Sequence, residues 1–544
     1  MAKTSHKFGL SWERKPEDIA DTVGSKIPLL SDMNQDVTTD AAAPYNILIR
    51  GDNYDALRIL SFTHKKKIDL IYIDPPYNTG SRTWKYNNKF VDKDDAYKHS
   101  KWLSFMENRL LLAKSVLSKT GSVIIAIDDY EMPYLSLLLD KLFPRYVKDT
   151  IVVIQHPQGS GSSTVSRIHE YALILTPPKL GFQGRNSVGK TSSWSLKRTG
   201  QGENNWRKNR PNSFYAILVD PISRKVVGVG PNLGRTERYH KGKDLHGNLQ
   251  KYPLDGDGGE RVWRYTRDRM QTLINKHAIN YTAKGSLTVT INNVAAEPVV
   301  SVWHDSKYSA GAHGTALLTK ILGKQGTFPY PKSIHTVHDM LKMIVGNNTS
   351  AIVLDFFAGS GTTGHAIFQL NQEDNGNRTF ILCTNNENKI FDDVCFPRIK
   401  NIITGYAYKE NGKIRHEKGL GGNLKCFDIT SCDYPHTDDL KFHLTQNIAC
   451  ALCARSGCFI PVLADENYAI YKNHHAKHIA ILFNPSHISE FVAYVNKNLH
   501  VGFITIYVFS YEKLISFDRF KKLKIKTKIF PIPSILTNVH AQRN

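Results

Sequence analysis

The chain has few cysteines and no long apolar run. Seven cysteines are spread over 544 residues, too few for the disulfide framework of a small secreted domain. No apolar stretch reaches the length that spans a membrane, and the N-terminus lacks the apolar core of a signal peptide. We therefore expect a protein of a reducing cytoplasm that contacts no membrane. There is also no internal repeat.

Acidic residues are scarce relative to basic ones. The chain contains 71 Lys and Arg against 49 Asp and Glu, which gives a net charge of +22 with His neutral. From Gly181 to Val300 there are 20 Lys and Arg against 9 Asp and Glu, a local excess of +11. Such an excess favours a polyanionic partner such as nucleic acid. The alternative is a basic surface that serves only solubility.

The length predicts two to four domains. In the first third of the chain, continuous apolar strand patterns such as Val123–Ile127 and Ile151–Ile154 alternate with helical patterns. Ser100 has the side chain of a helix N-cap, and apolar residues follow it at helical spacing as far as Leu117, before Gly121. This alternation predicts an α/β fold with a mostly parallel sheet that is covered on both faces.

The most informative motif is Asp74-Pro75-Pro76-Tyr77, directly after the strand pattern Ile68–Ile73. Two prolines fix the backbone, remove two N–H donors and hold the preceding residue in an extended conformation. The motif thus predicts a stiff turn that presents a carboxylate, carbonyl oxygens and an aromatic ring. That set suits a flat heterocycle with an exocyclic amino group.

A second motif follows the strand pattern Ile352–Leu354. Gly359, Gly361 and Gly364 fit the G-x-G-x-x-G turn of a nucleotide-binding βαβ unit, and Thr363–Leu370 can form the helix after it. Alone, this spacing is a weak signal. Together with the proline turn it indicates one site for a cofactor and one for the amine of a base.

With these two motifs the chain resembles the β-group of DNA amino-methyltransferases, in which the catalytic motif precedes the cofactor motif, as it does here. The resemblance extends over roughly residues 45 to 405, and the layout is most similar to the modification subunits of type III restriction–modification systems. Further segments that carry it are Gly51-Asp52-Asn53, Gly121–Asp129, His169–Leu175, Tyr330–Ser333 and Arg378–Lys400.

The resemblance implies a Rossmann-like methyltransferase core with an inserted DNA-recognition region and a small C-terminal α/β unit. The expected regions are an N-terminal arm (1–44), the catalytic half of the core (45–178), the inserted target-recognition region (179–300), the cofactor-binding half (301–410) and a C-terminal accessory or oligomerisation domain (411–544).

The reaction implied is methyl transfer from S-adenosylmethionine to the N6 amine of adenine in double-stranded DNA. Adenine N6 is a weak nucleophile, and acceptors on its N–H bonds favour the pyramidal transition state. We expect the Asp74 side chain and the Pro75 carbonyl to be these acceptors, with Pro76 stiffening the turn and Tyr77 stacking on the base. The base has to be flipped out of the duplex to reach them.

The cofactor is expected at the second motif, where glycines allow close approach and a helix N-terminus offers N–H groups to its carboxylate. The residues expected there are Asp355, Phe356, Gly359, Gly361 and Thr362, with Asp52 and Lys332 at family positions near the cofactor. The family often has an acid for the ribose after the next strand. This chain has Cys383-Thr384 there, and Asn385, Asn386 and Glu387 stay open as alternatives.

The resemblance also implies partners and leaves alternative functions open. It implies a homodimer, and a restriction subunit that supplies ATPase and nuclease activity. Cytosine N4 is the alternative target, although a motif that begins with Asp is commoner for adenine. A non-catalytic DNA specificity subunit and a Rossmann oxidoreductase are further alternatives, and the intact motifs argue against both.

The inserted region interleaves cations with aromatic rings in Trp206–Arg210 and Arg261–Tyr265. This mixture serves phosphate neutralisation and base contacts. A solvated basic face without a ligand is the alternative. Lys521–Lys526 predicts a basic strand that touches DNA or protects a sheet edge.

Two further patterns are interpreted as coincidental. Gly184–Thr191 fits the Walker A pattern, but it needs a strand directly before it and a helix directly after it, and neither is expected here. Cys450 and Cys453 have a spacing that suggests zinc, but we interpret them as buried thiols of a core helix and expect no metal.

Overall fold

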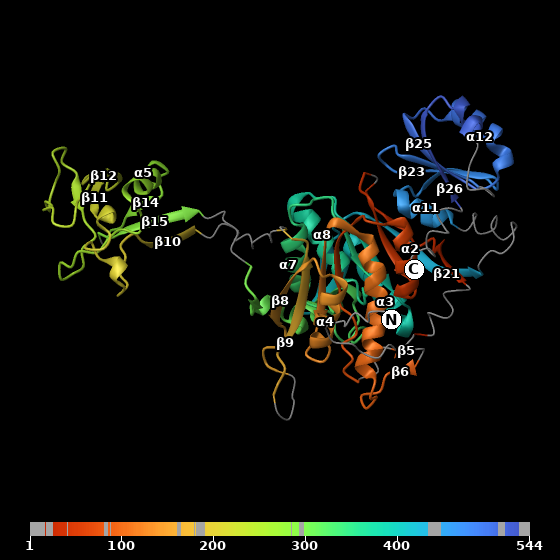
Figure 1. The fold of residues 1–544 in the computed structure, drawn as a ribbon, viewed down its shortest axis with the longest axis horizontal. Coiled ribbons are helices and arrows are strands. Elements are labelled where there is room, and N and C mark those ends of the chain that lie inside the picture. Colours follow the sequence, from red (N-terminus) through yellow and green to blue (C-terminus); the bar gives the residue numbers. More distant parts are fainter. Residues whose placement is uncertain are drawn as a thin grey trace, which may run out of the picture. The chain divides into compact units, whose positions relative to one another are not determined.

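The structure is a computed structural model that describes residues 17, 26–40, 42–80, 85–86, 89–159, 165–178, 180, 191–283, 285–292, 299–433, 448–509 and 517–532. It divides into two compact units, which we describe separately (Figure 1). Unit 1 comprises Met1–Gln183 and Val299–Asn544, and unit 2 comprises Gly184–Pro298.

A mixed, mostly parallel sheet forms the centre of unit 1 and has eleven strands among the described residues. Its order is β1-β21-β3-β18-β17-β4-β7-β9-β8-β16, with β2 paired to β21. The strands are β1 (Lys26–Asp32), β2 (Val37–Thr38), β3 (Tyr45–Arg50), β4 (Ile68–Ile73), β7 (Leu117–Ile127), β8 (Val147–Ile154), β9 (His169–Thr176), β16 (Val302–Trp303), β17 (Ile352–Asp355), β18 (Thr379–Thr384) and β21 (Asn423–Asp433).

The six strands from β21 to β7 pair in parallel, so their carboxyl ends share one edge. β9 is antiparallel to both β7 and β8, and β1 is antiparallel to β21. β17 pairs with β18 on one side and with β4, from the first half of the chain, on the other. Two segments far apart in sequence therefore meet at the middle of the sheet.

Helices cover both faces of the sheet. Alternate strand residues divide between two cores, with Ile71 and Ile125 in one and Leu70 and Ile124 in the other, because side chains along a strand point to opposite faces. The first core contains α2 (Asn53–Thr63), α3 (Lys98–Val116), α4 (Met132–Leu142) and α11 (Ala449–Ser456), and the second contains α6 (Ala316–Leu322), α7 (Ile334–Val345), α8 (Thr362–Asp374) and α9 (Phe396–Thr404). The predicted Rossmann-like α/β class is confirmed (Figure 1).

A smaller sheet follows in the C-terminal part of unit 1. Its order is β22-β23-β24-β25-β26, and the last three strands are parallel. The elements are β22 (Ile460–Ala464), β23 (Tyr468–Lys472), β24 (His478–Leu482), α12 (Ile488–Asn498), β25 (Phe503–Val508) and β26 (Lys526–Pro531). One face of this sheet packs on α12 and the other joins the α2–α11 core, so the C-terminal part is anchored to the central sheet. Two hairpins complete the described strands of unit 1, β5 (Lys85–Tyr86) with β6 (Lys89–Phe90) and β19 (Gly405–Glu410) with β20 (Lys413–Lys418).

Unit 2 has a core of its own around Tyr215, Ile217, Trp263 and Val289. Within its described residues it contains two three-stranded sheets, β10-β15-β14 and β12-β11-β13, and one α-helix. The elements are β10 (Thr191–Ser195), β11 (Tyr215–Val219), β12 (Val226–Asn232), β13 (Leu249–Lys251), α5 (Arg267–Asn275), β14 (Ile279–Tyr281) and β15 (Leu287–Asn292).

Three expectations need correction. Lys26–Asp32, expected in an N-terminal arm, is the edge strand β1, and β21, expected in the C-terminal domain, belongs to the central sheet, because the two pair across the whole length of the chain. Ser100 is not the cap of its helix, since α3 begins at Lys98. The predicted Lys521 strand is partly a 3₁₀ helix, Phe517–Lys522, and the edge strand β26 begins at Lys526.

Among the described residues, no helix has both the length and the apolarity to cross a membrane.

Candidate active site

The two predicted motifs lie side by side in the structure. β4 and β17 are parallel neighbours, with Val353 opposite Leu70 and Leu354 opposite Ile71. Asp74 follows the last residue of β4, and Asp355 is the last residue of β17. The charge of Asp74 is one of the influences that raise the pKa of Asp355. Both carboxylates therefore leave the sheet at the same edge, where open α/β sheets bind their ligands.

The Asp74–Tyr77 turn is held by contacts from two elements, α3 and β9. The Pro76 carbonyl accepts a hydrogen bond from Trp102 Nε1 of α3 at 2.7 Å. The Tyr77 hydroxyl lies 2.8 Å from Asp74 Oδ1 and 3.0 Å from Glu170 Oε2 on β9, both within donating distance. Within the described residues the Pro75 carbonyl accepts no hydrogen bond. The turn thus keeps one proline carbonyl for a ligand while the other is used to fix it.

Lys332 completes a charged cluster around this turn. It precedes α7, and its Nζ donates to Glu170 Oε2 and to the Tyr77 hydroxyl. It also lies 3.3 Å from Asp74 Oδ1. The side chains of Lys332 and Glu170 are only 10% and 3% exposed, whereas Asp74 is 27% exposed. Asp74 is therefore more accessible than either of its charged neighbours.

The cluster couples the protonation of its members. Burial raises the pKa of Asp74, and the charge of Lys332 opposes that rise. Burial alone would lower the pKa of Lys332, but Asp74 and Glu170 raise it above its ordinary value. Burial, with the charges of Asp74 and Glu170, raises the pKa of Tyr77 well above its ordinary value. Lys332 is thus a fixed cation that favours the ionised form of Asp74.

The second motif forms a closed turn around Asp355. Asp355 Oδ1 accepts from the Phe357 backbone N–H at 3.0 Å, and its Oδ2 accepts from Thr363 Oγ1 at 2.6 Å. The carboxyl is almost fully buried, and burial raises its pKa to about 7. The Thr362 hydroxyl lies 2.8 Å from a guanidinium nitrogen of the buried Arg398. Asp355 and Thr362 therefore shape the turn from within.

Glycine is required where this turn enters α8. Gly359 and Gly361 have φ angles of 49° and 79°, in the left-handed region that side chains disfavour. A Cβ on Gly364 would lie 2.8 Å from a methyl of Ile399 and 3.0 Å from one of Leu382. The first two glycines thus set the turn and the third allows α8 to pack closely on β18.

The start of α2 joins the same edge of the sheet. Asp52 caps α2 through the Tyr54 N–H at 2.7 Å and is 47% exposed. The next residue, Asn53, donates to the carbonyl of Phe356 at 3.0 Å and accepts from Arg109 Nε at 2.6 Å. Asn53 thereby ties Asp52 to the glycine turn. The predicted residues Asp52 and Phe356 are brought together.

The ribose candidates follow β18 and are all exposed. Asn386 is engaged through both ends of its amide, which bond to the side chain and backbone of Asp392 at 2.8 and 3.2 Å. Asn385 accepts from the Glu387 N–H at 3.4 Å. Glu387 is the one acid among the three.

A buried acid, Glu131, holds the residue that follows the Asp74–Tyr77 turn. Asn78, next to Tyr77, donates to Glu131 Oε1 at 2.5 Å, and His99 Nδ1 lies 2.7 Å from the same atom. Among the described residues the buried Oε2 of Glu131 has no hydrogen-bond partner. Burial raises the pKa of Glu131 to about 8, so this side chain is mostly uncharged at neutral pH.

Sequence reasoning missed several residues of this site. It assigned no role to Glu170, Trp102, Asn53 or Thr363, each of which fixes one of the two motifs. Glu170 and Asn53 lie in segments that carried the family resemblance, which was the available signal. Trp102 was expected only as a core residue on its helix, because no local sequence pattern predicts a long-range hydrogen bond from its ring nitrogen.

Two arginines of the basic stretches of unit 2, Arg207 and Arg261, are internal. Arg207 is buried, bonds to Glu260 at 3.0 Å and lies 4.2 Å from the Phe214 ring. Arg261 is buried against the Trp206 ring at 3.6 Å and pairs with Asp255. Interleaved cations and rings were expected to contact DNA, but these two arginines stabilise the unit instead. Lys208 and Arg264 of the same stretches are exposed, and further exposed cations of the unit are Arg235, Arg238, Lys241, Lys243 and Arg269.

The structure also bears on the two patterns that we interpret as coincidental, the Walker A pattern and the cysteine pair. Most of the Walker A pattern, 184–190, lies outside the described residues, and the segment that follows it is strand β10 rather than a helix. Cys450 and Cys453 lie on α11, where Cys453 is buried and Cys450 is half-buried. Both packing positions are those of core thiols.

Comparison with known proteins identifies the family. The DNA methylase family (N6_N4_Mtase) matches residues 68–392, which is more than half of the chain and includes both motifs. The chain belongs to this family.

Several members are similar in sequence. The type II methyltransferase M.KpnI of Klebsiella pneumoniae is 32% identical over 353 residues, which cover 62% of this chain and 79% of that protein. The Mod subunit of the type III enzyme StyLTI of Salmonella typhimurium is 28% identical, over 65% of this chain and 55% of the subunit. The EcoPI Mod subunit of Escherichia phage P1 is 27% identical, over 63% and 58%. The chain thus spans little more than half the length of these Mod subunits.

Solved structures are also similar, although distantly. The putative DNA modification methylase TTHA0409 of Thermus thermophilus, complexed with S-adenosyl-L-methionine, is 11% identical over 65% of this chain and 91% of that chain, with a TM-score of 0.29. The M1.HpyAVI–SAM complex is 13% identical over 65% and 98%, with a TM-score of 0.30.

The buried Glu131 generates a prediction about stability. Its folded pKa of about 8 lies above the ordinary value of 4.5, so its contribution to stability is full below about pH 4.5 and is lost as the pH rises through 8. We expect Glu131→Gln to flatten the fall in melting temperature between pH 6 and pH 9, and to be more stable than the wild type at pH 9. Thermal unfolding followed by fluorescence measures this.

The matched control is Glu490→Gln, which changes an exposed acid of α12. If Glu131→Gln and Glu490→Gln have the same pH dependence as the wild type, Glu131 is not a buried neutral acid.

Proposed function

We propose that the protein transfers a methyl group from S-adenosylmethionine to the N6 amine of an adenine that is flipped out of double-stranded DNA. The observation that carries the proposal is the pairing of β4 with β17, which sets the Asp74 turn and the Asp355–Gly361 turn at one edge of one sheet. Membership of the DNA methylase family supports it, as do the relatives named as methyltransferases and Mod subunits.

In this proposal Asp74 and the Pro75 carbonyl accept the two N–H bonds of the target amine. Asp74 is the stronger acceptor when it is ionised, and Lys332 at 3.3 Å favours that state against the effect of burial. The bonds at the Tyr77 hydroxyl fix the plane of its ring, as stacking on an extruded base requires. Catalysis then consists of prearranged acceptors around the amine.

The residues of the second motif fit the cofactor. The left-handed glycines bring backbone close to a ligand, and exposed Asp52 and Glu387 offer carboxylates for its ammonium and ribose hydroxyls. Phe357 is half-buried and packs beside Phe356 and Phe105, with ring centroids 5.2 and 5.9 Å away, so it offers an apolar wall. When bound, S-adenosylmethionine supplies the activated methyl group.

Adenine is the proposed target because the turn begins with Asp, which is commoner for adenine in the resembling family. Cytosine N4 is the second candidate, since its amine presents the same N–H geometry to the turn. Unit 2 is proposed to contact the DNA target through its exposed cations, whose number suits phosphate neutralisation.

We further propose that the protein acts as a homodimer and associates with a restriction subunit that supplies ATPase and nuclease activity. The similarity to Mod subunits of type III enzymes supports this. Light scattering after size exclusion tests the dimer. A monomer mass for the DNA-bound protein contradicts that part of the proposal and leaves the methyl transfer untouched.

Transfer of a radioactive methyl group tests the central proposal. We expect the full chain to label mixed-sequence duplex DNA from tritiated S-adenosylmethionine, and digestion followed by mass spectrometry to find N6-methyladenine. Asp74→Ala removes an acceptor, and a loss of at least about a hundredfold in rate is expected, the order of one preorganised hydrogen bond.

The control Asp94→Ala changes an exposed acid in the segment before α3. Full transfer by Asp74→Ala contradicts the proposed role of the turn, and N4-methylcytosine in the digest establishes the second candidate instead.

The structure and the family resemblance give Lys332 different neighbours. The resemblance places Lys332 near the cofactor, whereas its contacts are with Asp74, Glu170 and Tyr77. Removing its charge in Lys332→Met raises the pKa of Asp74 further, so a larger fraction is protonated and is a weaker acceptor. We therefore expect the acid limb of the pH–rate profile to move to higher pH, with about a tenfold loss of rate per pKa unit below it.

Lys324→Met, an exposed lysine of the same segment, is the control, and Lys332→Arg is expected to restore most of the profile. A raised KM for the cofactor with an unchanged pH profile would assign Lys332 to the cofactor rather than to Asp74.

A further inference from the structure

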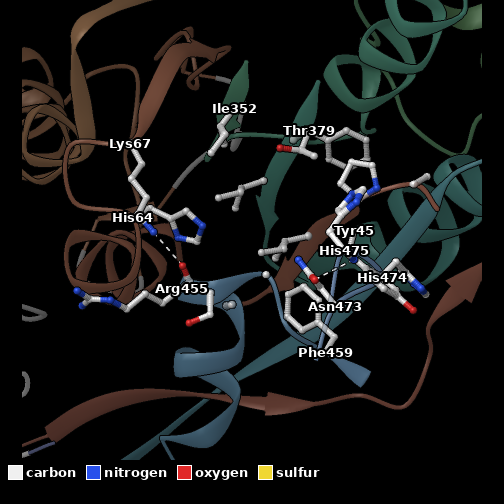
Figure 2. Close-up of a pocket in the computed structure, with 18 residues that line it drawn as sticks. Tyr45, His64, Lys67, Ile352, Thr379, Arg455, Phe459, Asn473, His474 and His475 are labelled. Carbon is white, nitrogen blue, oxygen red and sulfur yellow. Dashed lines mark hydrogen bonds between the residues drawn. The ribbon is translucent and has the colours of Figure 1, made fainter. Parts of the chain in front are cut away.

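A cavity of about 250 Å³ lies at the edge of the central sheet opposite the candidate active site (Figure 2). Tyr45, Ile352 and Thr379, the first residues of β3, β17 and β18, line it. The catalytic motifs lie at the carboxyl ends of these parallel strands, so the length of the strands separates the cavity from them. Its other wall comes from α11 and from the turn between β23 and β24.

The side chains of this cavity that can carry a charge at neutral pH are all bases. Lys67 and Arg455 line it, with the imidazoles of His64, His474 and His475. No Asp or Glu is among its described lining residues. Figure 2 shows Lys67 and His64 on one side of the space and His474 and His475 on the other, while the Arg455 side chain extends away from the two imidazoles of His474 and His475. A cavity lined by cations and imidazoles without a carboxylate favours an anion.

The negative ends of two helices offset only part of this positive charge. Lys67 Nζ donates to the Arg455 carbonyl at 2.8 Å, the neighbouring Lys477 donates to the Ser456 carbonyl at 2.5 Å, and Arg455 donates to the Phe62 carbonyl at 3.3 Å. These carbonyls end α11 and α2, and each helix end carries about half a negative charge. Two helix ends thus offset about one of these three cations. Lys67 and Arg455 line the cavity and Lys477 lies outside its lining, so a net positive charge remains for an anion.

Two observations show that these groups lack a counter-charge. Burial, together with the charges of Arg455 and Lys477, lowers the pKa of Lys67 to about 8, and no acid opposes that shift. His474 is stacked on Tyr45, with ring centroids 5.8 Å apart, and its buried Nε2 has no hydrogen-bond partner among the described residues. An acceptor oxygen in the cavity would satisfy both groups.

We propose that this cavity is a binding site for a small phosphate monoester, held by Lys67, Arg455 and His474 between the central sheet and the C-terminal sheet. A phosphate carries nearly two negative charges at neutral pH and several acceptor oxygens. It therefore matches the remaining charge and the unpartnered imidazole.

The size of the cavity limits the rest of the ligand. Small-molecule pockets usually measure about 300–1,000 Å³, so a volume of about 250 Å³ suits a sugar phosphate or a mononucleotide and excludes a duplex. Tyr45 and Phe459, whose rings meet edge to face at 5.3 Å, provide an apolar surface for the ester. The exposed Lys67 and His475 leave a route to solvent.

Isothermal titration calorimetry of the full chain tests the proposal with ribose 5-phosphate as the probe and ribose as its uncharged control. The probe has no base, so it does not imitate the methyl donor. We expect saturable binding of one ribose 5-phosphate per chain, no binding of ribose, and about a tenfold or greater loss of affinity in Lys67→Met and in Arg455→Gln, the fold-change of one charge-assisted hydrogen bond.

The matched control is Lys65→Met, which removes an exposed lysine two residues away that does not line the cavity. Melting temperatures without ligand verify that each variant is folded, and His474→Gln replaces any variant that is not. Absence of saturable binding by the wild type overturns the proposal, as does equal affinity in Lys65→Met and the cavity variants. A short duplex that competes with ribose 5-phosphate, and loses affinity in the same variants, overturns the assignment to a small ligand.

Discussion

Parallel pairing of β4 with β17 is the constraint on which the site depends. The two strands belong to segments separated by unit 2 in the sequence, and only the register of Val353 with Leu70 sets their ends at the same height. At that height the chain leaves the sheet through two stiff turns, one made by prolines and one by left-handed glycines. The sheet therefore fixes the distance between the two turns, which are the proposed amine acceptor and the proposed cofactor site.

Charge compensation at this edge explains much of the surrounding structure. A buried ion that loses its partner destabilises a protein by about 3–5 kcal/mol, so Lys332 and Glu170 have to stay together. Their pairing in turn positions the Tyr77 hydroxyl and holds Asp74 near a cation. Glu131, uncharged for the most part, supports the neighbouring Asn78 without adding another charge. The same arrangement that stabilises the turn keeps Asp74 ready to accept.

Local features of the site were predictable from the sequence, because prolines, glycines and strand–helix patterns act over a few residues. The Asp74 turn and β17 lie within one residue of their predicted places, and α8 begins one residue before and ends four residues after the predicted helix. Features set by pairing across the chain were not predictable. β1 looked like a polar arm, Glu170 and Lys332 meet from opposite halves of the core, and Arg207 looked like a DNA contact although it is buried.

The most direct measurement is a crystal structure of the full chain with S-adenosylhomocysteine and a short duplex that contains its methylation site. The account predicts that the sulfur atom lies between the Asp74 carboxylate and the Gly359 turn, with an extruded base against Tyr77. A product molecule bound away from the glycine turn, or a target base still stacked in the duplex, would contradict it.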